Sequence, residues 1–285
     1  MRILFTGTGR FGSWQMRGVQ MAFQREAWKA VPNASSKDIR SIDVVVIVKH
    51  AAPDTIDLLQ RWKGPVVYDP LDFWTIVPEF DRMASGILTA SQARNLFGEY
   101  FRKINPALIL CATRAMAEDL APLGMPADVL YHHFDPRLTI VERNRIERPV
   151  VLYHGADTIG LWKFPMHVVS RVSGARFIQS SAALPPPADV LVAVRGGAHA
   201  NWLSKRWKSN VKAATALRLG LPFVAWPEAS YIETHPSALW FQTLSEMRVA
   251  IRKALKYPRA VPETEKFSVA WSANELERIL SAQLS

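Results

Sequence analysis

Short apolar runs alternate with polar or amphipathic stretches along most of this chain of 285 residues. The run at 44–48 contains only valine and isoleucine, which is typical of a parallel strand buried on both faces. Comparable runs lie at 2–6, 65–68, 107–112, 129–131, 150–154, 189–194 and 222–225. Helices are predicted at about 13–23, 55–62, 90–104, 114–120, 209–219, 238–255 and 271–284. Strands that alternate with helices predict parallel sheets joined by right-handed crossovers.

The length and one polar segment predict more than one domain. Single cores stop growing at roughly 250 residues, and Pro136–Pro149 is polar and arginine-rich, as linkers are. The apolar pattern then starts again at Val150. We therefore expect an α/β chain with two Rossmann-like, doubly wound domains that face a central cleft. Residues 1–147 should form the first domain and 148–268 the second, with 269–285 as a closing helix.

Composition excludes several classes of protein. Apolar residues make up 49% and charged residues 21% of the chain, which is the ordinary range for globular proteins and argues against disorder or a fibre. The single cysteine, Cys111, allows no intrachain disulfide and no cysteine-based zinc site. No apolar run reaches the ~18 residues of a membrane span, so we expect a cytoplasmic protein. No metal site is expected, because His132 and His133 are adjacent and should point apart.

Positive charge is concentrated in one part of the sequence. The chain has 35 basic and 25 acidic residues, a net charge of +10. No acidic residue occurs between Leu191 and Pro227, where the basic residues are Arg195, Lys205, Arg206, Lys208, Lys212 and Arg218. Such a block predicts an anionic partner, which could be a diphosphate, a nucleic acid or an acidic membrane surface. The alternative is a solvated helix face.

A glycine-rich loop follows the first predicted strand. Gly7, Gly9 and Gly12 have the spacing of a dinucleotide-binding fingerprint. That fingerprint also needs an acidic residue ~20 positions later to hold the ribose, and the segment 29–33 has none. A nicotinamide or flavin site, close packing of strand and helix, and an approach route for an acceptor molecule are the three alternatives. The residues concerned on the acceptor side are Arg10, Gly12, Ser13, which we expect to cap the helix, and Trp14.

A second motif combines a helix start with positive charge. Lys208, Ser209 and Asn210 begin a predicted helix that ends at Gly220, and helix N-termini bind anions through their unused N–H groups. Arg195 follows a strand and could add charge at the same sheet edge. Glu228 follows the next strand, where a carboxylate can accept hydrogen bonds from a ribose diol. Otherwise Lys208 is a surface charge and Glu228 a turn residue.

The segments Lys208-Ser209-Asn210, Gly220–Ala225 and Pro227-Glu228-x-x-Tyr231 resemble the nucleotide-sugar-binding half of GT-B glycosyltransferases. Gly12–Trp14 with Arg17 and Gln20, the 67–72 segment, Cys111–Leu120 and the helix around Trp271 resemble other parts of that family. The resemblance implies a hexosyltransferase with a UDP-sugar donor, no tightly bound cofactor, and a last helix that returns to the first domain. It implies a diphosphate ligand at Lys208 and a ribose ligand at Glu228. The donor-site residues are then Gly155, Arg195, Lys208, Ser209, Asn210, Glu228 and Tyr231.

One family feature is missing. Many retaining members carry two glutamates eight positions apart, where this chain has Trp207 and Thr215. The stereochemical outcome therefore stays open. A catalytic base is needed for inversion, and the candidates are Asp72 and Asp69 after one strand and His154 after another. His132 and His133 are further candidates, and either aspartate could instead cap a turn.

The size, the charge and the aromatic content of the chain bear on the acceptor. In size and charge the chain resembles phage glucosyltransferases that use UDP-glucose to modify hydroxymethylated DNA bases, and its ten tryptophans suit an extruded base. A DNA base is favoured over a saccharide or lipid-linked acceptor. The rival functions are an NAD(P)- or flavin-dependent enzyme and a non-catalytic nucleic-acid-binding protein. The oligomeric state cannot be predicted.

Overall fold

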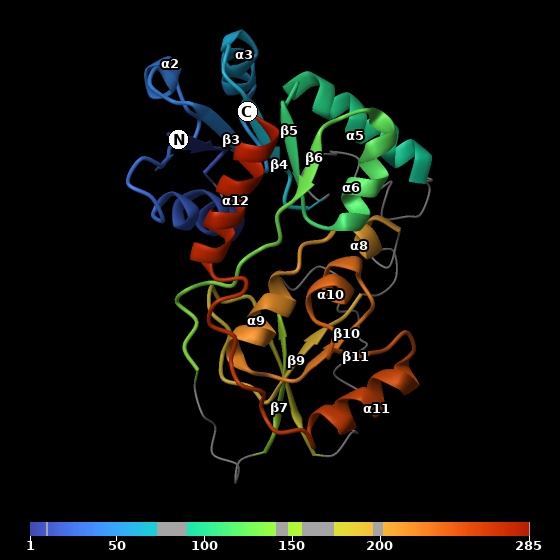
Figure 1. The fold of residues 1–285 in the computed structure, drawn as a ribbon. Coiled ribbons are helices and arrows are strands. Elements are labelled where there is room, and N and C mark those ends of the chain that lie inside the picture. The colour runs from blue at the N-terminus through green and yellow to red at the C-terminus, as the bar shows by residue number, and fades with distance from the viewer. Residues whose placement is uncertain (10, 73–89, 141–147, 156–173, 196–201, 285) are drawn as a thin grey trace. The chain divides into compact units, whose positions relative to one another are not determined.

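A computed structural model describes residues 1–9, 11–72, 90–140, 148–155, 174–195 and 202–284 (Figure 1). They form two compact units. The first contains residues 1–133, 206–209 and 267–285, and the second contains 134–205 and 210–266. The chain thus enters the second unit after His133, ahead of the predicted boundary at 147, and its last segment from Phe267 on belongs to the first unit.

The first unit is built on a six-stranded parallel sheet in the order β2-β1-β3-β4-β5-β6. The strands are β1 (Ile3–Thr6), β2 (Lys29–Ala30), β3 (Val44–Val48), β4 (Val66–Asp69), β5 (Leu108–Cys111) and β6 (Ala127–Val129). The helices are α1 (Phe11–Trp14), a π-helix (Gln15–Gln20), α2 (Ser36–Ile39), α3 (Pro53–Arg61), α5 (Ala90–Ile104), α6 (Arg114–Leu120), a 3-10 turn (Ala121–Leu123) and α12 (Val269–Gln283). The predicted parallel, doubly wound arrangement is confirmed, while β2 was not predicted.

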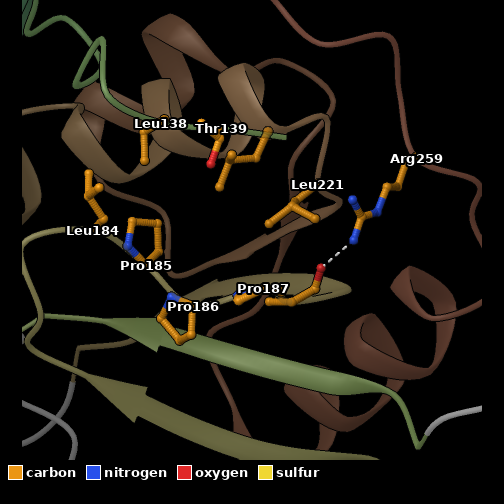
Figure 2. A pocket seen from close by; sticks show the side chains of 10 residues that line it. Leu138, Thr139, Leu184, Pro185, Pro186, Pro187, Leu221 and Arg259 are labelled. Carbon is orange, nitrogen blue, oxygen red and sulfur yellow. Dashed lines mark hydrogen bonds between the residues drawn. The ribbon is translucent and has the colours of Figure 1, made fainter. Parts of the chain in front are cut away.

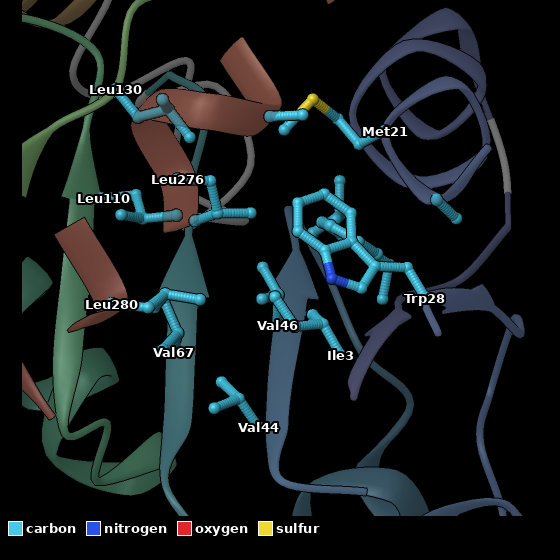
Figure 3. Packing of buried hydrophobic residues seen from close by; sticks show 14 of the residues in the cluster. Ile3, Met21, Trp28, Val44, Val46, Val67, Leu110, Leu130, Leu276 and Leu280 are labelled. Carbon is cyan, nitrogen blue, oxygen red and sulfur yellow. The ribbon is translucent and has the colours of Figure 1, made fainter. Parts of the chain in front are cut away.

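Strand β3 contains only valine and isoleucine, because both faces of the sheet are covered. Its neighbours are β1 and β4, paired in parallel through Ile3 with Val44 and Val45 with Val66. Val44, Val46 and Val48 belong to the core cluster that Figure 3 shows. On β4, next to β3, Tyr68 points the other way and packs against Phe101 of α5, with ring centroids 5.5 Å apart. Alternate residues of these strands therefore pack into two cores, one on each face of the sheet.

The last helix, α12, completes the core of the first unit. Leu276, Ile279 and Leu280 are fully buried in the same cluster as the strand residues Val67 and Leu110 (Figure 3). Burial of such a side chain contributes about 1.5–3 kcal/mol. The predicted closing helix therefore returns to the first unit, where its buried side chains form part of the core.

The second unit has a five-stranded parallel sheet in the order β11-β10-β9-β7-β8. The strands are β7 (Val150–His154), β8 (Arg176–Ser180), β9 (Val190–Ala193), β10 (Phe223–Ala225) and β11 (Leu239–Trp240). The helices that follow residue 195 are α8 (Trp202–Trp207), α9 (Val211–Leu219), α10 (Ala229–Thr234) and α11 (Leu244–Ala254). The first five strands of each unit have the same relative order, with the second strand outermost and the third next to the first. Two Rossmann-like units are thus confirmed, whereas the cleft between them stays a prediction.

Several predicted helix ends are confirmed, and two are corrected. Thr113 caps α6 by accepting a hydrogen bond from the amide of Met116, as expected. Gly220 ends α9 with φ of 64°, a conformation that favours glycine. Ser13 is not a helix cap, because α1 already begins at Phe11. The predicted helix at 238–255 is divided, since β11 comes first and the capping box of Thr243 starts α11 five residues after Leu239.

Candidate functional site

The carboxyl edge of the second sheet carries one group of candidate residues. Open parallel sheets bind ligands at this edge, where the strand order reverses, which here is between β7 and β9. Gly155 follows β7, Arg195 comes soon after β9, and Glu228 comes after β10. The Nε of Arg195 donates to Oε1 of Glu228 at 2.8 Å, and their side chains are only 5% and 1% exposed. Arg195 and Glu228, two residues predicted for the donor site, therefore fix the orientation of each other's side chains.

One of the two carboxylate oxygens of Glu228 has no hydrogen-bond partner among the described residues. Glu228 is the N-cap residue of α10 but makes no side-chain capping bond, and the oxygen without a partner, Oε2, is buried. Burial raises the pKa of Tyr231 well above its usual value, and Glu228 raises it further, so the phenol stays protonated. For Arg195, burial alone would lower the pKa, but Glu228 and two tyrosines offset it and the pKa is raised. A buried carboxylate oxygen without a donor is costly, so it would gain from a ligand hydroxyl.

His154 and the start of α9 belong to the same group. The Nε2 of His154 lies 2.8 Å from the carbonyl oxygen of Ala182, which can only accept, so Nε2 carries the proton and Nδ1 is an acceptor. Burial lowers the pKa of His154, and the charge of Lys212 lowers it further. The Nζ of Lys212 lies 5.0 Å from the ring centroid of Tyr153, a β7 residue. Asn210, the N-cap residue of α9, makes no side-chain capping bond.

The basic block at 195–218 has partners inside the protein. Three of its members form ion pairs, which are Arg195–Glu228, Arg206–Asp119 and Lys208–Asp72. The other three lie over aromatic rings, which are Lys205 over Trp226, Lys212 over Tyr153 and Arg218 over Phe134. The prediction that these charges need an external polyanion is thereby weakened, since each already has an internal partner.

Lys208 and Ser209 lie in the first unit. The Nζ of Lys208 is 2.8 Å from Oδ2 of Asp72, with both side chains largely buried at 13% and 14% exposure. The structure therefore brings the predicted diphosphate lysine together with the predicted base, and it does not bring this lysine into the unit of Arg195 and Glu228.

Asp69 has a different environment from Asp72. Its Oδ2 accepts from Nε of Arg17 at 2.8 Å, and its Oδ1 accepts from the amide of Leu71 at 3.1 Å. The same guanidinium donates to the carbonyls of Leu130 and Tyr131, both at 3.2 Å. Burial raises the pKa of Asp69, although Arg17 opposes this. Both oxygens of Asp69 are therefore engaged, one by Arg17 and the other by the turn that follows β4.

The chain leaves β3 and β4 in the same unusual conformation. Lys49 and Leu71 have φ of 67° and 61°, which lie in the left-handed region that is unfavourable for residues other than glycine. The amide of Lys49 donates to the carbonyl of Asp69, so the two turns are joined. They direct the chain to His50 and Asp72. Burial lowers the pKa of His50, and the charge of Asp72 opposes this. His50 was missed in the sequence, although a histidine directly after a buried strand is a usable signal.

The other residues that the sequence predicted for the site have surroundings that suit a structural role. His132 donates its Nδ1 proton to the carbonyl of His133 at 2.8 Å, and burial lowers its pKa to about 3, so it is neutral. His133 lies 3.2 Å from Oε1 of Gln20. Trp14 packs in the first core, and Ser13 has a buried Oγ. Gly12 has open space where a Cβ would lie, so the third glycine of the dinucleotide fingerprint is not required by packing. Arg10 lies outside the described residues.

A pocket elsewhere on the second unit is not this site. It lies where Leu184–Ala188 lead into the amino end of β9, and the rest of its lining is Leu138, Thr139, Leu219, Leu221 and Arg259 (Figure 2). Its volume of about 50 Å³ is far below the roughly 300 Å³ of a small ligand site. Within the described ranges, no group of three or more histidine, cysteine, aspartate or glutamate side chains could hold a metal ion. No helix in those ranges is long and apolar enough to cross a membrane.

No family model matches the chain, and no curated protein matches it. Among solved structures, the glycotransferase of kitacinnamycin is 14% identical with a TM-score of 0.47, covering 99% of this chain and 95% of that one. The calicheamicin glycosyltransferase CalG4 is 10% identical with a TM-score of 0.41, covering 99% and 95%. Os79 from O. sativa, in complex with UDP, is 10% identical with a TM-score of 0.43, covering 96% and 94%. Scores below 0.5 at such identities establish neither a shared fold nor a shared function.

Proposed function

We propose that this chain is a GT-B glycosyltransferase of the hexosyltransferase type, which moves a sugar from a nucleotide-diphosphate sugar to a hydroxyl group. The observation that carries the proposal is the buried Oε2 of Glu228, which has no hydrogen-bond partner among the described residues and lies after β10 of a doubly wound sheet. A ribose diol supplies the two O–H donors that a carboxylate accepts. Arg195, bound to the other oxygen, fixes the orientation of the carboxylate.

The second unit offers further contacts for such a donor. The first-turn N–H groups of α9 have no partners within the helix, and Lys212 lies in that turn, so both favour the negative charge that builds on a departing diphosphate. UDP is the nucleotide we propose. Because Glu228 is 1% exposed, ribose can reach its oxygen only when neighbouring side chains move. His154 and Gly155, at the end of β7, complete this edge.

The first unit offers the acceptor chemistry. We assign to Asp72 the removal of the proton from the acceptor hydroxyl. Lys208, whose Nζ lies 2.8 Å from Oδ2 of Asp72, holds this carboxylate in place. A hydroxymethylated DNA base is the acceptor we propose, on the net charge of +10 alone, since the basic block no longer supports it. Saccharide and lipid-linked hydroxyls are the alternatives. The buried single cysteine fits a reducing compartment such as the cytoplasm.

The test begins with nucleotide binding. Calorimetric titration with UDP, dTDP and GDP should show binding of at least one of them, and Glu228→Gln should weaken it by about 10- to 100-fold, since a hydrogen bond to a charged group contributes ~1.5–3 kcal/mol. Glu265→Gln, a change at an exposed glutamate of the same unit, is the matched control. Glu228→Gln keeps an oxygen for Arg195, and a melting curve reports whether the variant is folded.

Two results would overturn the proposal. Absence of binding by every nucleotide would exclude a nucleotide-sugar enzyme, and NAD(P)H binding in its place would favour the rival function. Unchanged affinity in a folded Glu228→Gln variant would exclude the ribose role. Transfer from UDP-glucose to plain DNA, hydroxymethylated DNA and a free saccharide then identifies the acceptor. We expect Asp72→Asn to lower the transfer rate by at least about 100-fold.

A further inference from the structure

The segment 206–209 belongs to the first unit, although the chain on both sides of it belongs to the second. Arg206 and Trp207 end α8, and Lys208 and Ser209 lead to α9. Side chains of the first unit bind this segment, and they come from α6, from its cap and from α5.

Asp119, near the end of α6, is the centre of this binding. Its Oδ2 accepts from Nε of Arg206 at 2.7 Å and from Nε1 of Trp207 at 2.9 Å, and its Oδ1 accepts from Nη2 of Arg206 at 3.1 Å. The residue is only 9% exposed. Three donors thus converge on one buried carboxylate, and all of them come from two consecutive residues of the segment.

Two further contacts hold the same residues. Thr113, the cap of α6, donates its hydroxyl to the carbonyl of Arg206 at 2.5 Å. Trp207 is fully buried, and its ring centroid lies 4.6 Å from that of Phe97 of α5. The backbone, the guanidinium and the indole are therefore all fixed at the point where the chain reaches Lys208.

The next two residues enter the candidate site of the first unit. Lys208 pairs with Asp72 at 2.8 Å, and Ser209 lines a small hollow with Asp69 and His132. The stem of a lysine side chain is flexible, so its ammonium group keeps one position only while the backbone that carries it is held within reach of its partner. A buried ion pair adds little net stability compared with apolar packing, whereas it does impose a defined geometry.

We propose that Asp119 is a positioning residue, which holds Arg206 and Trp207 and thereby places Lys208 on Asp72 for sugar transfer. The proposal rests on the proposed function for its effect on catalysis, but the anchoring itself can be tested without any activity. A displacement of about 1 Å near reacting groups can cost on the order of 100-fold in rate.

The first experiment measures amide hydrogen exchange in the full chain. Asp119→Asn should make the amides of 206–209 exchange at least about tenfold faster, because it removes the charge that holds Arg206. Glu118→Gln is the matched control, since Glu118 contacts the same guanidinium at 3.5 Å but is 71% exposed, and it should leave exchange unchanged. Trp207→Phe, which removes one N–H and keeps the ring packing, should give a smaller change in the same direction and serves if Asp119→Asn does not fold. Unchanged exchange in a folded Asp119→Asn or Trp207→Phe variant overturns the anchoring.

The second experiment is a double-mutant cycle on transfer from the nucleotide sugar. Asp119→Asn should lower kcat/KM by about 10- to 100-fold in the wild-type background and cause little further loss in a Lys208→Ala background. Losses that multiply would show a general structural effect and overturn the positioning role. If the wild-type protein transfers no sugar while exchange at 206–209 still responds to Asp119→Asn, the anchoring is supported, and both the proposed function and the positioning of Lys208 for sugar transfer fail.

Discussion

Replacement of Arg17 by methionine tests the physical account of the first unit most directly. Arg17 comes from the π-helix, and its guanidinium binds Asp69 and the carbonyls of Leu130 and Tyr131. The side chains of Arg17 and Asp69 are 2% and 4% exposed. Methionine fills much of the same volume but leaves the carboxylate of Asp69 buried without its counter-charge.

The expected loss of stability is large and depends on pH. Removing one partner of a buried ion pair costs about 3–5 kcal/mol near neutral pH. Burial already raises the pKa of Asp69 in the folded protein, and Arg17 is the main group that lowers it, so the variant should have a still higher pKa at Asp69. A carboxyl group whose pKa is raised by folding is favoured in its protonated form. Its contribution is therefore present below the unfolded pKa and is lost as the pH rises through the folded value.

We accordingly expect the difference in the free energy of unfolding between wild type and Arg17→Met to shrink as the pH falls from neutral toward about 4, the ordinary pKa of an aspartate. His132 acts in the same direction, because Arg17 helps to keep its pKa low. Urea unfolding followed by circular dichroism across this range measures the effect. The double variant Arg17→Met/Asp69→Asn should lose the part of this pH dependence that comes from Asp69 and keep the part that comes from His132. Arg2→Met, which breaks a surface pair with side chains 56% and 40% exposed, is the control and should change little. A loss below about 1 kcal/mol, or one that grows toward acid pH, would refute the reasoning.

Two further predictions concern packing. Leu276→Ala, in α12, should destabilise the first unit by about 2–5 kcal/mol, measured by urea unfolding, whereas a loss below about 1 kcal/mol would mean that this helix does not complete the core. Gly220→Ala should destabilise the second unit more than Gly174→Ala, as compared by melting temperature. Both glycines have positive φ, but a Cβ at Gly220 would lie 2.4 Å from the carbonyl oxygen of Ala260, and a Cβ at Gly174 would meet nothing within 4 Å. Equal effects would show that backbone conformation alone matters at Gly220.

Local features were predictable because neighbouring residues determine them. The buried strand at 44–48 could be predicted from its apolar run alone. The caps at Thr113 and Gly220 could be predicted from the type of residue that stands next to a helical pattern. The start of α1 was missed because Ser13, the residue type that caps helices, lies two residues after the actual start at Phe11. The edge strands β2, β8 and β11 were missed. β2 and β11 have only two residues each, which is too short for a pattern, and β8 has five residues of mixed polarity that are not fully buried.

The sequence by itself determined two parallel α/β units and the kinds of residue at their strand ends. Only the tertiary structure decided which of those residues meet. Lys208 and Asp72 are 136 residues apart, and Arg206 and Asp119 are 87 apart. A run of basic residues without acids therefore suggested an outside partner, whereas the fold supplied acids and aromatic rings from elsewhere in the chain. Hydrophobic periodicity depends on neighbours a few positions away, but ion-pair partners depend on which distant loops the crossovers bring to one edge of a sheet.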